Sequence, residues 1–419
     1  MEILPKSLGT RPRLAVEIRL GGVVAARAED ASSGVISQVS RIELHAEAIE
    51  PGLKAGNFKE SGLVVAAVRR ALESVTEKGL GREVTLVVPD ATVRVLLLDF
   101  DSLPAKAAEA LPVVRFRLKK LLPFDADDAA VSYQVMSGTR NVEKGALRVV
   151  AVAIPREVLN EYEAVVREAG FEPGAVLPST LAALAGLPEE EAATLVVNAG
   201  PQAVTTAIVE NGVLLLHRSV DMSGNVQVGI LAEAAVVLPD AEEGTSKIPL
   251  LPLIDVEGSQ QEWAMQQPVD PFGRDQPASL KNFDYDPNGE ALAAIRAEMY
   301  AEPARVPDYG SAYQTQATLR AAAEAKRGQV REVTQAVSVA AAYFEDTLAA
   351  PPKVVLSAGS TGADSLGAML GEAGFGEIAQ DGSRIRVREI VDEDTLVAQA
   401  VSAQVPRSWM AGVRGALRS

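Results

Sequence analysis

The chain has 419 residues, of which 47% are hydrophobic and 23% charged, so it is long enough for two or more domains with sizeable cores. Its net charge of −16 argues against nucleic acid as a partner, because a sequence-independent grip on phosphates needs an excess of Lys and Arg. With no cysteine and two histidines, the chain excludes disulfides, thiolate zinc sites and multi-histidine metal sites.

Residues 1–83 are predicted to form the first part of an α/β domain. Three strands and one helix are expected at Arg13–Ile18, Val23–Ala28, Val35–Leu44 and Glu60–Lys78. The first two strands meet at a turn near Gly21-Gly22. A glycine at such a turn lets backbone N–H groups approach a phosphate, because no Cβ blocks the way.

Residues 84–186 are predicted to form an α+β subdomain inserted into this first half. Its strands are expected at Val84–Val88, Val93–Phe100, Val131–Met136, Leu147–Ile154 and Gly174–Leu177. Its helices are expected at Ala105–Leu122, Glu157–Ala169 and Ser179–Gly186. The alternation of strands and helices is typical of a compact α+β unit.

The strand-turn-strand opening recurs at residues 187–239, which begin a second domain. β-prone runs and the turns between them are found at Thr194–Val197, Asn198–Pro201, Ala203–Val209, Asn211-Gly212 and Val213–Leu216. Two similar openings indicate a duplicated α/β unit with a cleft between the copies, which is a common place for a nucleotide.

Residues 240–312 are predicted to be an acidic, Pro-rich insert. Between 240 and 310 the chain has 14 acidic residues against five basic ones and no sustained hydrophobic periodicity, which favours a disordered loop. A partner-binding segment around Trp263, Phe272 and Tyr285 is the alternative.

The second domain is expected to resume at 313–405, and a basic tail follows at 406–419. A helix, a strand, a glycine turn and a second helix are expected at Thr315–Thr347, Lys353–Ala358, Gly359–Gly362 and Ala363–Gly371. A strand, glycine turn and helix in this order favour a phosphate or nucleoside. In the tail, Trp409, Val413 and Leu417 lie four residues apart among arginines, the pattern of a short amphipathic helix that contacts a membrane or a partner.

Two segments, 103–136 and 148–187, resemble the type IV pilus assembly protein PilM family. The first has the pair Pro123-Phe124, an acidic run and Tyr133 in a strand, and the second has a helix that runs into Ala169-Gly170-Phe171. The glycine turns fall in the order of that family, so the resemblance covers all but the acidic insert and the two ends. It implies an α/β, actin-like fold of duplicated RNase H-like domains with an α+β subdomain inserted in the first half.

The resemblance also implies a cofactor in the cleft, ATP with Mg²⁺. Mapped onto this chain, the residues that would hold it are Glu17, Arg19, Asn198, Gly200, Thr205, Gly359 and Ser360. Arg19 and Thr205 also have plainer interpretations, as a surface arginine at a strand end and an ordinary strand residue.

The turns depart from the family pattern. Arg19 and Asn198 stand where the family has Gly and Asp, and Ala358 replaces a Gly. Mg²⁺ prefers carboxylate and water oxygens, and Glu17 is the one candidate carboxylate. We therefore expect a degenerate nucleotide site, to which no catalytic residue and no metal ligand is assigned.

Proteins of the PilM family are cytoplasmic and bind the cytoplasmic tail of the membrane protein PilN between the first subdomain and the insert. The resemblance therefore implies an adaptor at the inner face of the inner membrane, with other cytoplasmic pilus machinery as further partners and only peripheral membrane contact. We expect Phe124 to contact the tail and Arg117 and Lys120 to steer an acidic flank. The alternatives are a core role for Phe124 and a solvated helix face for the basic residues.

Two other functions stay open. An active actin-like ATPase or small-molecule kinase would share the fold, but phosphoryl transfer relies on a bound metal, which the altered turns disfavour. The cytoplasmic domain of a type II secretion linker is disfavoured because no run of about 20 apolar residues follows. The lack of such a run and of a signal peptide predicts a cytoplasmic location.

Overall fold

The structure is a computed structural model, and it describes residues 11–29, 35–77, 79, 81–136, 147–187, 193–222, 309–374, 385–391 and 405–418. The acidic insert predicted at 240–312 lies outside these residues, apart from its C-terminal end. The chain divides into two compact units, Met1–Val236 with Ala317–Ser419, and Val237–Gln316. The description below concerns the first unit, together with the helix that enters it from the second.

The first half is built on a five-stranded sheet with the first strand of the chain at its centre. The strand order is β3 (Ile36–Glu43), β2 (Gly22–Ala28), β1 (Leu14–Arg19), β4 (Glu83–Val88) and β8 (Glu172–Pro178). β1, β2 and β3 are antiparallel, whereas β4 runs parallel to β1 and β8. Helices α1 (Ser61–Val75) and α3 (Arg156–Glu168) cover one face, and α4 (Ser179–Ala185) and α10 (Ala411–Leu417) the other. Because both faces are covered, β1 is buried along its whole length.

The second half repeats this sheet. Its strand order is β11 (Val213–Asp221), β10 (Ala203–Glu210), β9 (Thr194–Ala199), β12 (Val354–Ser357) and β13 (Arg386–Glu389). The first three are antiparallel and the last two are parallel to β9, as in the first sheet. Helix α8 (Ala363–Glu372) and the part of α7 (Tyr309–Leu348) from Val333 onward pack on the outer face. The predicted duplicated α/β fold is confirmed.

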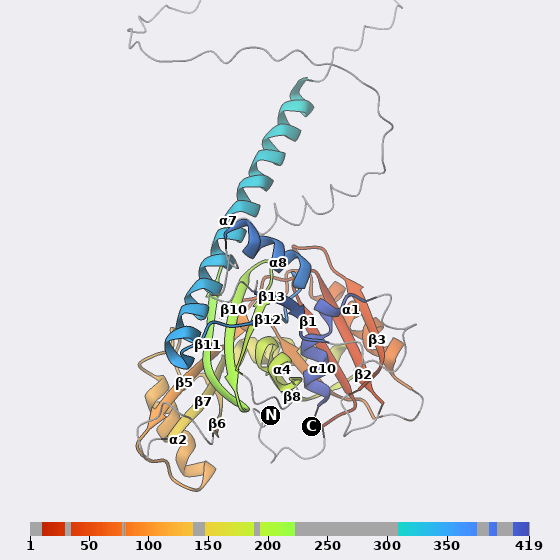
Figure 1. Ribbon diagram of the computed structural model, residues 1–419. Coiled ribbons are helices and arrows are strands. Elements are labelled where there is room, and N and C mark those ends of the chain that lie inside the picture. The colour runs from red at the N-terminus through yellow and green to blue at the C-terminus, as the bar shows by residue number, and fades with distance from the viewer. Residues whose placement is uncertain are drawn as a thin grey trace, which may run out of the picture. The chain divides into compact units, whose positions relative to one another are not determined.

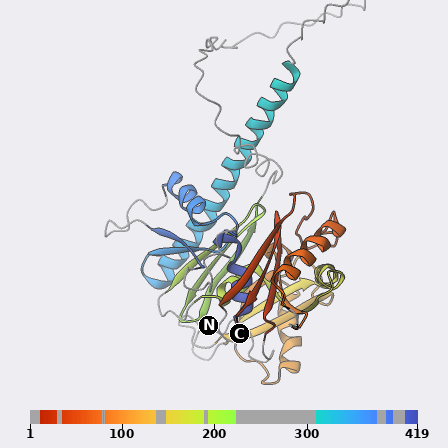
Figure 2. The same ribbon diagram turned by 90° about the vertical axis from the view of Figure 1, so that its right-hand side faces the viewer.

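The two sheets meet over a shared apolar layer. Helices α4 and α10 lie between them in both views (Figures 1 and 2). One buried cluster there joins Ala15 of β1 and Val413 of α10 to Val196 and Ala207 of the second sheet. The halves are therefore packed together, with a cleft at the end where β1 and β9 run into their turns.

The inserted subdomain is smaller than the sequence predicts. A separate antiparallel sheet has the order β5 (Arg94–Phe100), β7 (Leu147–Pro155) and β6 (Ala129–Met136), and α2 (Ala107–Leu118) packs on it. The expected boundaries, 84–186, also include β4, α3, β8 and α4, which belong to the first half. β4 pairs with β1 across 70 residues of sequence, as in the pair Ala15 and Thr85, and such long-range parallel pairing leaves no local signature.

The C-terminal segment is an internal part of the fold and not a free amphipathic tail. Trp409, Val413 and Leu417 are all buried, and α10 packs against α4. A Cβ added to Gly415 would lie 1.7 Å from the carbonyl oxygen of Ala182, so glycine is what allows the two helices to approach. The apolar side chains that predicted membrane contact are thus covered by the chain itself. None of the described helices is long and apolar enough to cross a membrane.

Candidate functional site

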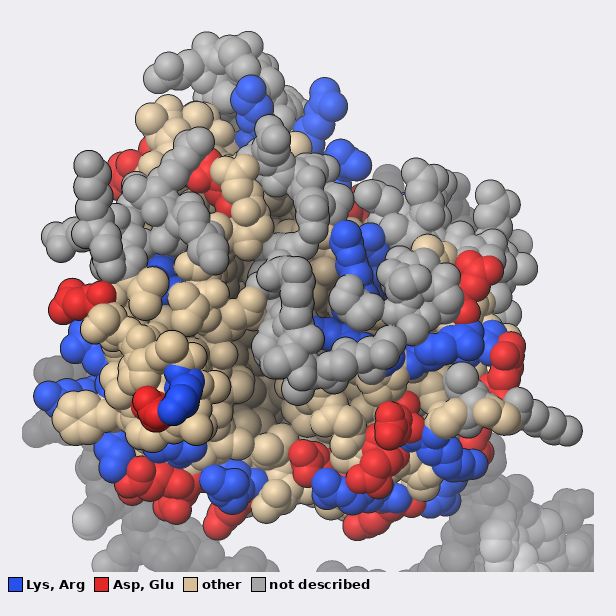
Figure 3. All heavy atoms as spheres, turned by 90° about the horizontal axis from the view of Figure 1, so that it is seen from below, with Lys and Arg blue, Asp and Glu red and all other residues tan. Residues whose placement is uncertain are grey.

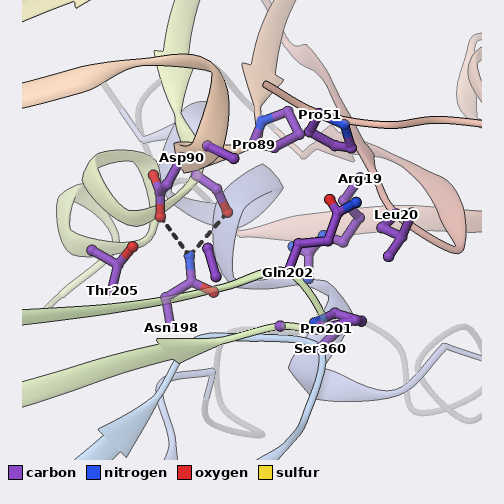
Figure 4. Close-up of a pocket in the computed structure, with 14 residues that line it drawn as sticks. Arg19, Leu20, Pro51, Pro89, Asp90, Asn198, Pro201, Gln202, Thr205 and Ser360 are labelled. Carbon is purple, nitrogen blue, oxygen red and sulfur yellow. Dashed lines mark hydrogen bonds between the residues drawn. The ribbon is translucent and has the colours of Figure 1, made fainter. Parts of the chain in front are cut away.

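The cleft between the halves brings together five of the residues proposed from sequence to bind a cofactor. Arg19, Asn198, Gly200, Thr205 and Ser360 all line it. The other lining residues are Leu20, Pro51, Pro89, Asp90, Ala91, Ser179, Pro201, Gln202 and Ala203. They come from the end of β1, the loop after β3, the 3₁₀ turn Asp90–Thr92 with the proline before it, the start of α4, the β9–β10 turn with the start of β10, and the loop after β12. Figure 4 labels most of them.

Glu17 and Arg19 form an ion pair inside the protein. They lie two residues apart on β1, so their side chains leave the same face of the strand. Glu17 is fully buried, its Oε2 pairs with Nη2 of Arg19, and the Ser179 hydroxyl donates to its Oε1 at 2.7 Å. The guanidinium of Arg19 also reaches the carbonyl oxygen of Ser408, at 3.4 Å. The two charged side chains that were expected to bind a nucleotide, Glu17 and Arg19, therefore pair with each other.

Trp409 covers the first glycine turn. Its indole ring lies against Gly21 and Gly22, where an added Cβ would be 3.8 Å and 3.3 Å from the ring atoms. The guanidinium carbons of Arg19 and Arg41 lie 5.0 Å and 3.9 Å from the ring centroid, within the range of cation–π attraction. The absence of side chains at this turn makes room for an indole ring from the C-terminal segment.

Asn198 connects the second half to the first. Its Nδ2 lies 2.9 Å from Thr180 Oγ1, 3.2 Å from Asp90 Oδ2 and 3.3 Å from Ser179 Oγ. Two of these contacts are drawn in Figure 4. Asp90 is buried and also accepts hydrogen bonds from the backbone N–H (3.0 Å) and the hydroxyl of Thr180. A continuous polar network therefore crosses the cleft from β9 to β1.

The remaining cofactor candidates also bond or pack within the chain. The N–H of Gly200 donates to Ala203 at 3.0 Å, and the Thr205 hydroxyl donates to Ser219 at 3.0 Å. A Cβ added to Gly359 would lie 2.1 Å from the carbonyl oxygen of Ala199, so this glycine serves a close approach of two backbones. Ser360 lines the cleft beside Gly200.

These residues do not fit ATP with Mg²⁺. Arg19 is the one positively charged side chain among the described residues that line the cleft, and Glu17 neutralises it. Nowhere in the described parts of the chain do three or more His, Asp or Glu side chains gather as metal ligands would. A triphosphate would also face the buried carboxylate of Asp90. The cleft therefore offers neither a free cation nor a metal-ligand set to an anionic cofactor.

His217 lies on β11 of the second sheet, and both of its ring nitrogens are buried. It pairs with Ala207, which belongs to the apolar cluster between the halves. Burial lowers the pKa of the imidazole below its ordinary value, and the nearby negative charge of Asp90 opposes this shift only in part. The imidazole is therefore neutral in the folded protein at neutral pH.

The three partner residues predicted from sequence lie on and beside α2. Arg117 and Lys120 are exposed, whereas Phe124 is half-buried and packs on the core of the inserted subdomain. Phe116 is instead 68% exposed, the largest value among the big apolar side chains described, and Leu121 is 50% exposed. The structure thus offers Phe116 as the free aromatic ring of this helix.

Several network residues were missed in the sequence. Asp90 lies between two predicted strands and was given no role. Ser179 and Thr180 were interpreted only as a helix start, and Trp409 as part of an amphipathic helix that contacts a membrane or a partner. Their positions depend on contacts between distant parts of the chain, which local patterns do not carry. Phe116 did leave a signal, because the buried positions Ala110, Val114 and Leu118 place it on the opposite side of the helix.

Comparisons with known proteins show the fold. No family model and no curated protein matches the sequence. The solved structure of a PilM–PilN type IV pilus biogenesis complex is 14% identical, covers 98% of both chains and has a TM-score of 0.59. Ethanolamine utilization protein EutJ from Carboxydothermus hydrogenoformans is 11% identical over 97% of this chain and 89% of its own, with a TM-score of 0.41. The cytoplasmic domain of EpsL from the type II secretion system of Vibrio cholerae is 15% identical over 55% of this chain and 78% of its own, with a TM-score of 0.32.

The chain is a protein of the actin-like fold. Its structure is similar to PilM over almost the whole length of both, so the resemblance stated from sequence is confirmed for the fold.

Proposed function

We propose that this chain is a PilM-like adaptor of the type IV pilus inner-membrane complex, which binds the cytoplasmic tail of a PilN-like membrane protein. Two observations support this. The fold is similar to that of PilM in a PilM–PilN complex. At the cleft that serves nucleotides in ATPases of this fold, Glu17, Arg19 and Asn198 make their contacts within the chain. An adaptor needs no turnover, so a binding role agrees with such a cleft. The ATPase or kinase alternative is also compatible with the fold, but the internal ion pair of Glu17 and Arg19 argues against it.

We place the tail on the α2 surface, defined here as Val113, Phe116, Arg117, Lys120 and Leu121. The first four have the spacing i, i+3, i+4, i+7, so they lie on one side of the helix and its C-terminal extension. All five are exposed, and clustered exposed apolar side chains mark binding sites on soluble proteins. This cluster carries the proposal.

The chemistry of the α2 surface fits a short apolar tail with an acidic flank. Phe116 and Leu121 offer apolar anchors, and the adjacent cations Arg117 and Lys120 attract opposite charge. Elsewhere the chain is acidic overall, and Figure 3 shows Lys, Arg, Asp and Glu side chains interspersed along the face seen from below. We propose that the complex acts at the inner face of the inner membrane, with other cytoplasmic pilus machinery, and that this chain touches the membrane only peripherally.

The test is a fluorescence anisotropy titration of a labelled PilN-like tail peptide with the full chain. Phe116→Ala should weaken binding at least tenfold, because a central aromatic anchor dominates such interfaces. Arg117→Glu with Lys120→Glu should weaken binding and abolish its salt dependence. Val339→Ala, which removes a 42% exposed side chain on α7, is the matched control and should bind as the parent does. Equal affinity of all four proteins would overturn the α2 surface as the tail site.

A further inference from the structure

The polar network across the cleft forms a closed chain of contacts, which we call the clasp. It consists of Glu17, Arg19, Asp90, Ser179, Thr180 and Asn198. Five of these residues belong to the first half and one, Asn198, to the second. Any opening of the cleft at this point must break the contacts of the Asn198 amide.

The charge inside the clasp has a permanent partner. Glu17 is 0% exposed, and an isolated carboxylate at such a place would be costly. Arg19 supplies the opposite charge from the same strand and is held in turn by Trp409 and the Ser408 carbonyl. Since α10 approaches Glu17 so closely that a Cβ on Gly412 would lie 2.5 Å from Oε2, no room is left there for a hydrated ion.

The amide at position 198 suits the clasp better than a carboxylate would. Its Nδ2 is a hydrogen-bond donor, and the oxygens of Asp90, Thr180 and Ser179 around it are acceptors. A carboxylate in its place would face the Asp90 carboxylate, and two such groups resist simultaneous ionisation. The identity of this residue therefore determines whether the halves attract or repel across the cleft.

We propose that the clasp replaces a nucleotide as the connection between the halves, so that the chain keeps the closed arrangement without ligand and leaves Mg·ATP unbound in the cleft. This inference concerns the cleft alone and does not depend on the α2 surface. The residues at which the turns depart from the family pattern, Arg19 and Asn198, disfavour an anion in the cleft. The same two residues make the contacts of the clasp.

The experiment measures the distance between the halves by pulsed electron paramagnetic resonance. The chain has no cysteine, so Ser74→Cys on α1 and Ser365→Cys on α8, both exposed, give two unique spin-label sites in the full chain. The doubly labelled parent should give one narrow distance distribution that millimolar Mg·ATP leaves unchanged, and calorimetric titration with Mg·ATP should show no binding. A shift on adding Mg·ATP, or saturable heat, would overturn the proposal.

Variants of Asn198 test the connection itself. Asn198→Ala should broaden the distribution toward longer distances, whereas Gln202→Ala, which trims another side chain in the cleft, should not. Asn198→Asp keeps the size of the side chain. Its distance distribution should be narrow at pH 5 and broad at pH 8, because deprotonation places two carboxylates next to each other. If Asn198→Ala fails to fold, the pH response of the Asn198→Asp distance distribution tests the clasp by itself. A distribution that neither variant alters contradicts the clasp.

Discussion

At the scale of single residues, the pairing of Glu17 with Arg19 decides what either charge can bind. Arg19 lines the cleft between the halves, and its guanidinium pairs with buried Glu17. A buried ion pair adds little stability by comparison with an apolar pair of similar volume, but removing one member leaves an uncompensated charge. The pair is therefore best tested by a double-mutant cycle.

We expect Arg19→Met to lower the free energy of unfolding by about 3–5 kcal/mol, because Glu17 then remains buried and unpaired. Glu17→Gln combined with Arg19→Met should recover most of that loss. Urea unfolding followed by circular dichroism measures both. A double variant whose loss equals the sum of the two single losses would show that the pair is not coupled.

His217 gives a pH-dependent prediction at the same scale. Its folded pKa lies below the ordinary value of 6.5 because burial disfavours the imidazolium. The unfolded chain takes up a proton first as the pH falls, so stability is complete above about 6.5 and declines toward the folded pKa, by up to about 1.4 kcal/mol per pH unit. His217→Leu should flatten this acid limb of the stability profile. His45→Gln, which changes the half-exposed second histidine, should leave the limb in place.

At the scale of elements, local patterns predicted most helices and strands and long-range pairing decided the rest. The Asn211-Gly212 hairpin was predictable because both residues adopt positive φ (49° and 76°), as the turn type of that dipeptide requires. The boundaries of the inserted subdomain were not, because β4 and β8 join the first sheet by parallel pairing. The membrane interpretation of α10 failed for a related reason. An apolar stripe on a short helix fits a core as well as a lipid surface.

The contact between α10 and α4 depends on small residues. Gly415→Ala should destabilise the protein by about 2 kcal/mol or more, because the new Cβ would overlap the Ala182 carbonyl oxygen unless the helices separate. Gly328→Ala in α7 is the control, and its effect on stability should have the opposite sign. Its added Cβ meets nothing within 4 Å, so the better helix former should stabilise by about 0.5–1 kcal/mol. Thermal unfolding compares the two, and equal effects would contradict the proposed packing role of Gly415.

At the scale of the whole molecule, two repeated sheets share one apolar layer and one polar clasp, while the inserted subdomain presents its own exposed surface on α2. Five of the seven candidate cofactor residues line one cleft, so sequence alone indicated which segments meet there. The contacts that these residues make were not predictable, because Trp409, Asp90 and Thr180 reach them from distant parts of the chain. We therefore propose that the cleft holds the halves together and that α2 binds the partner.

The measurement that tests this account most directly is the affinity of the full chain for the PilN-like tail peptide, determined by anisotropy with and without millimolar Mg·ATP. The account predicts saturable binding of one peptide per chain, weakened at least tenfold by Phe116→Ala, with the same affinity whether or not Mg·ATP is present. Absence of saturable binding would contradict the adaptor function. Binding that requires Mg·ATP would contradict the assignment of the cleft.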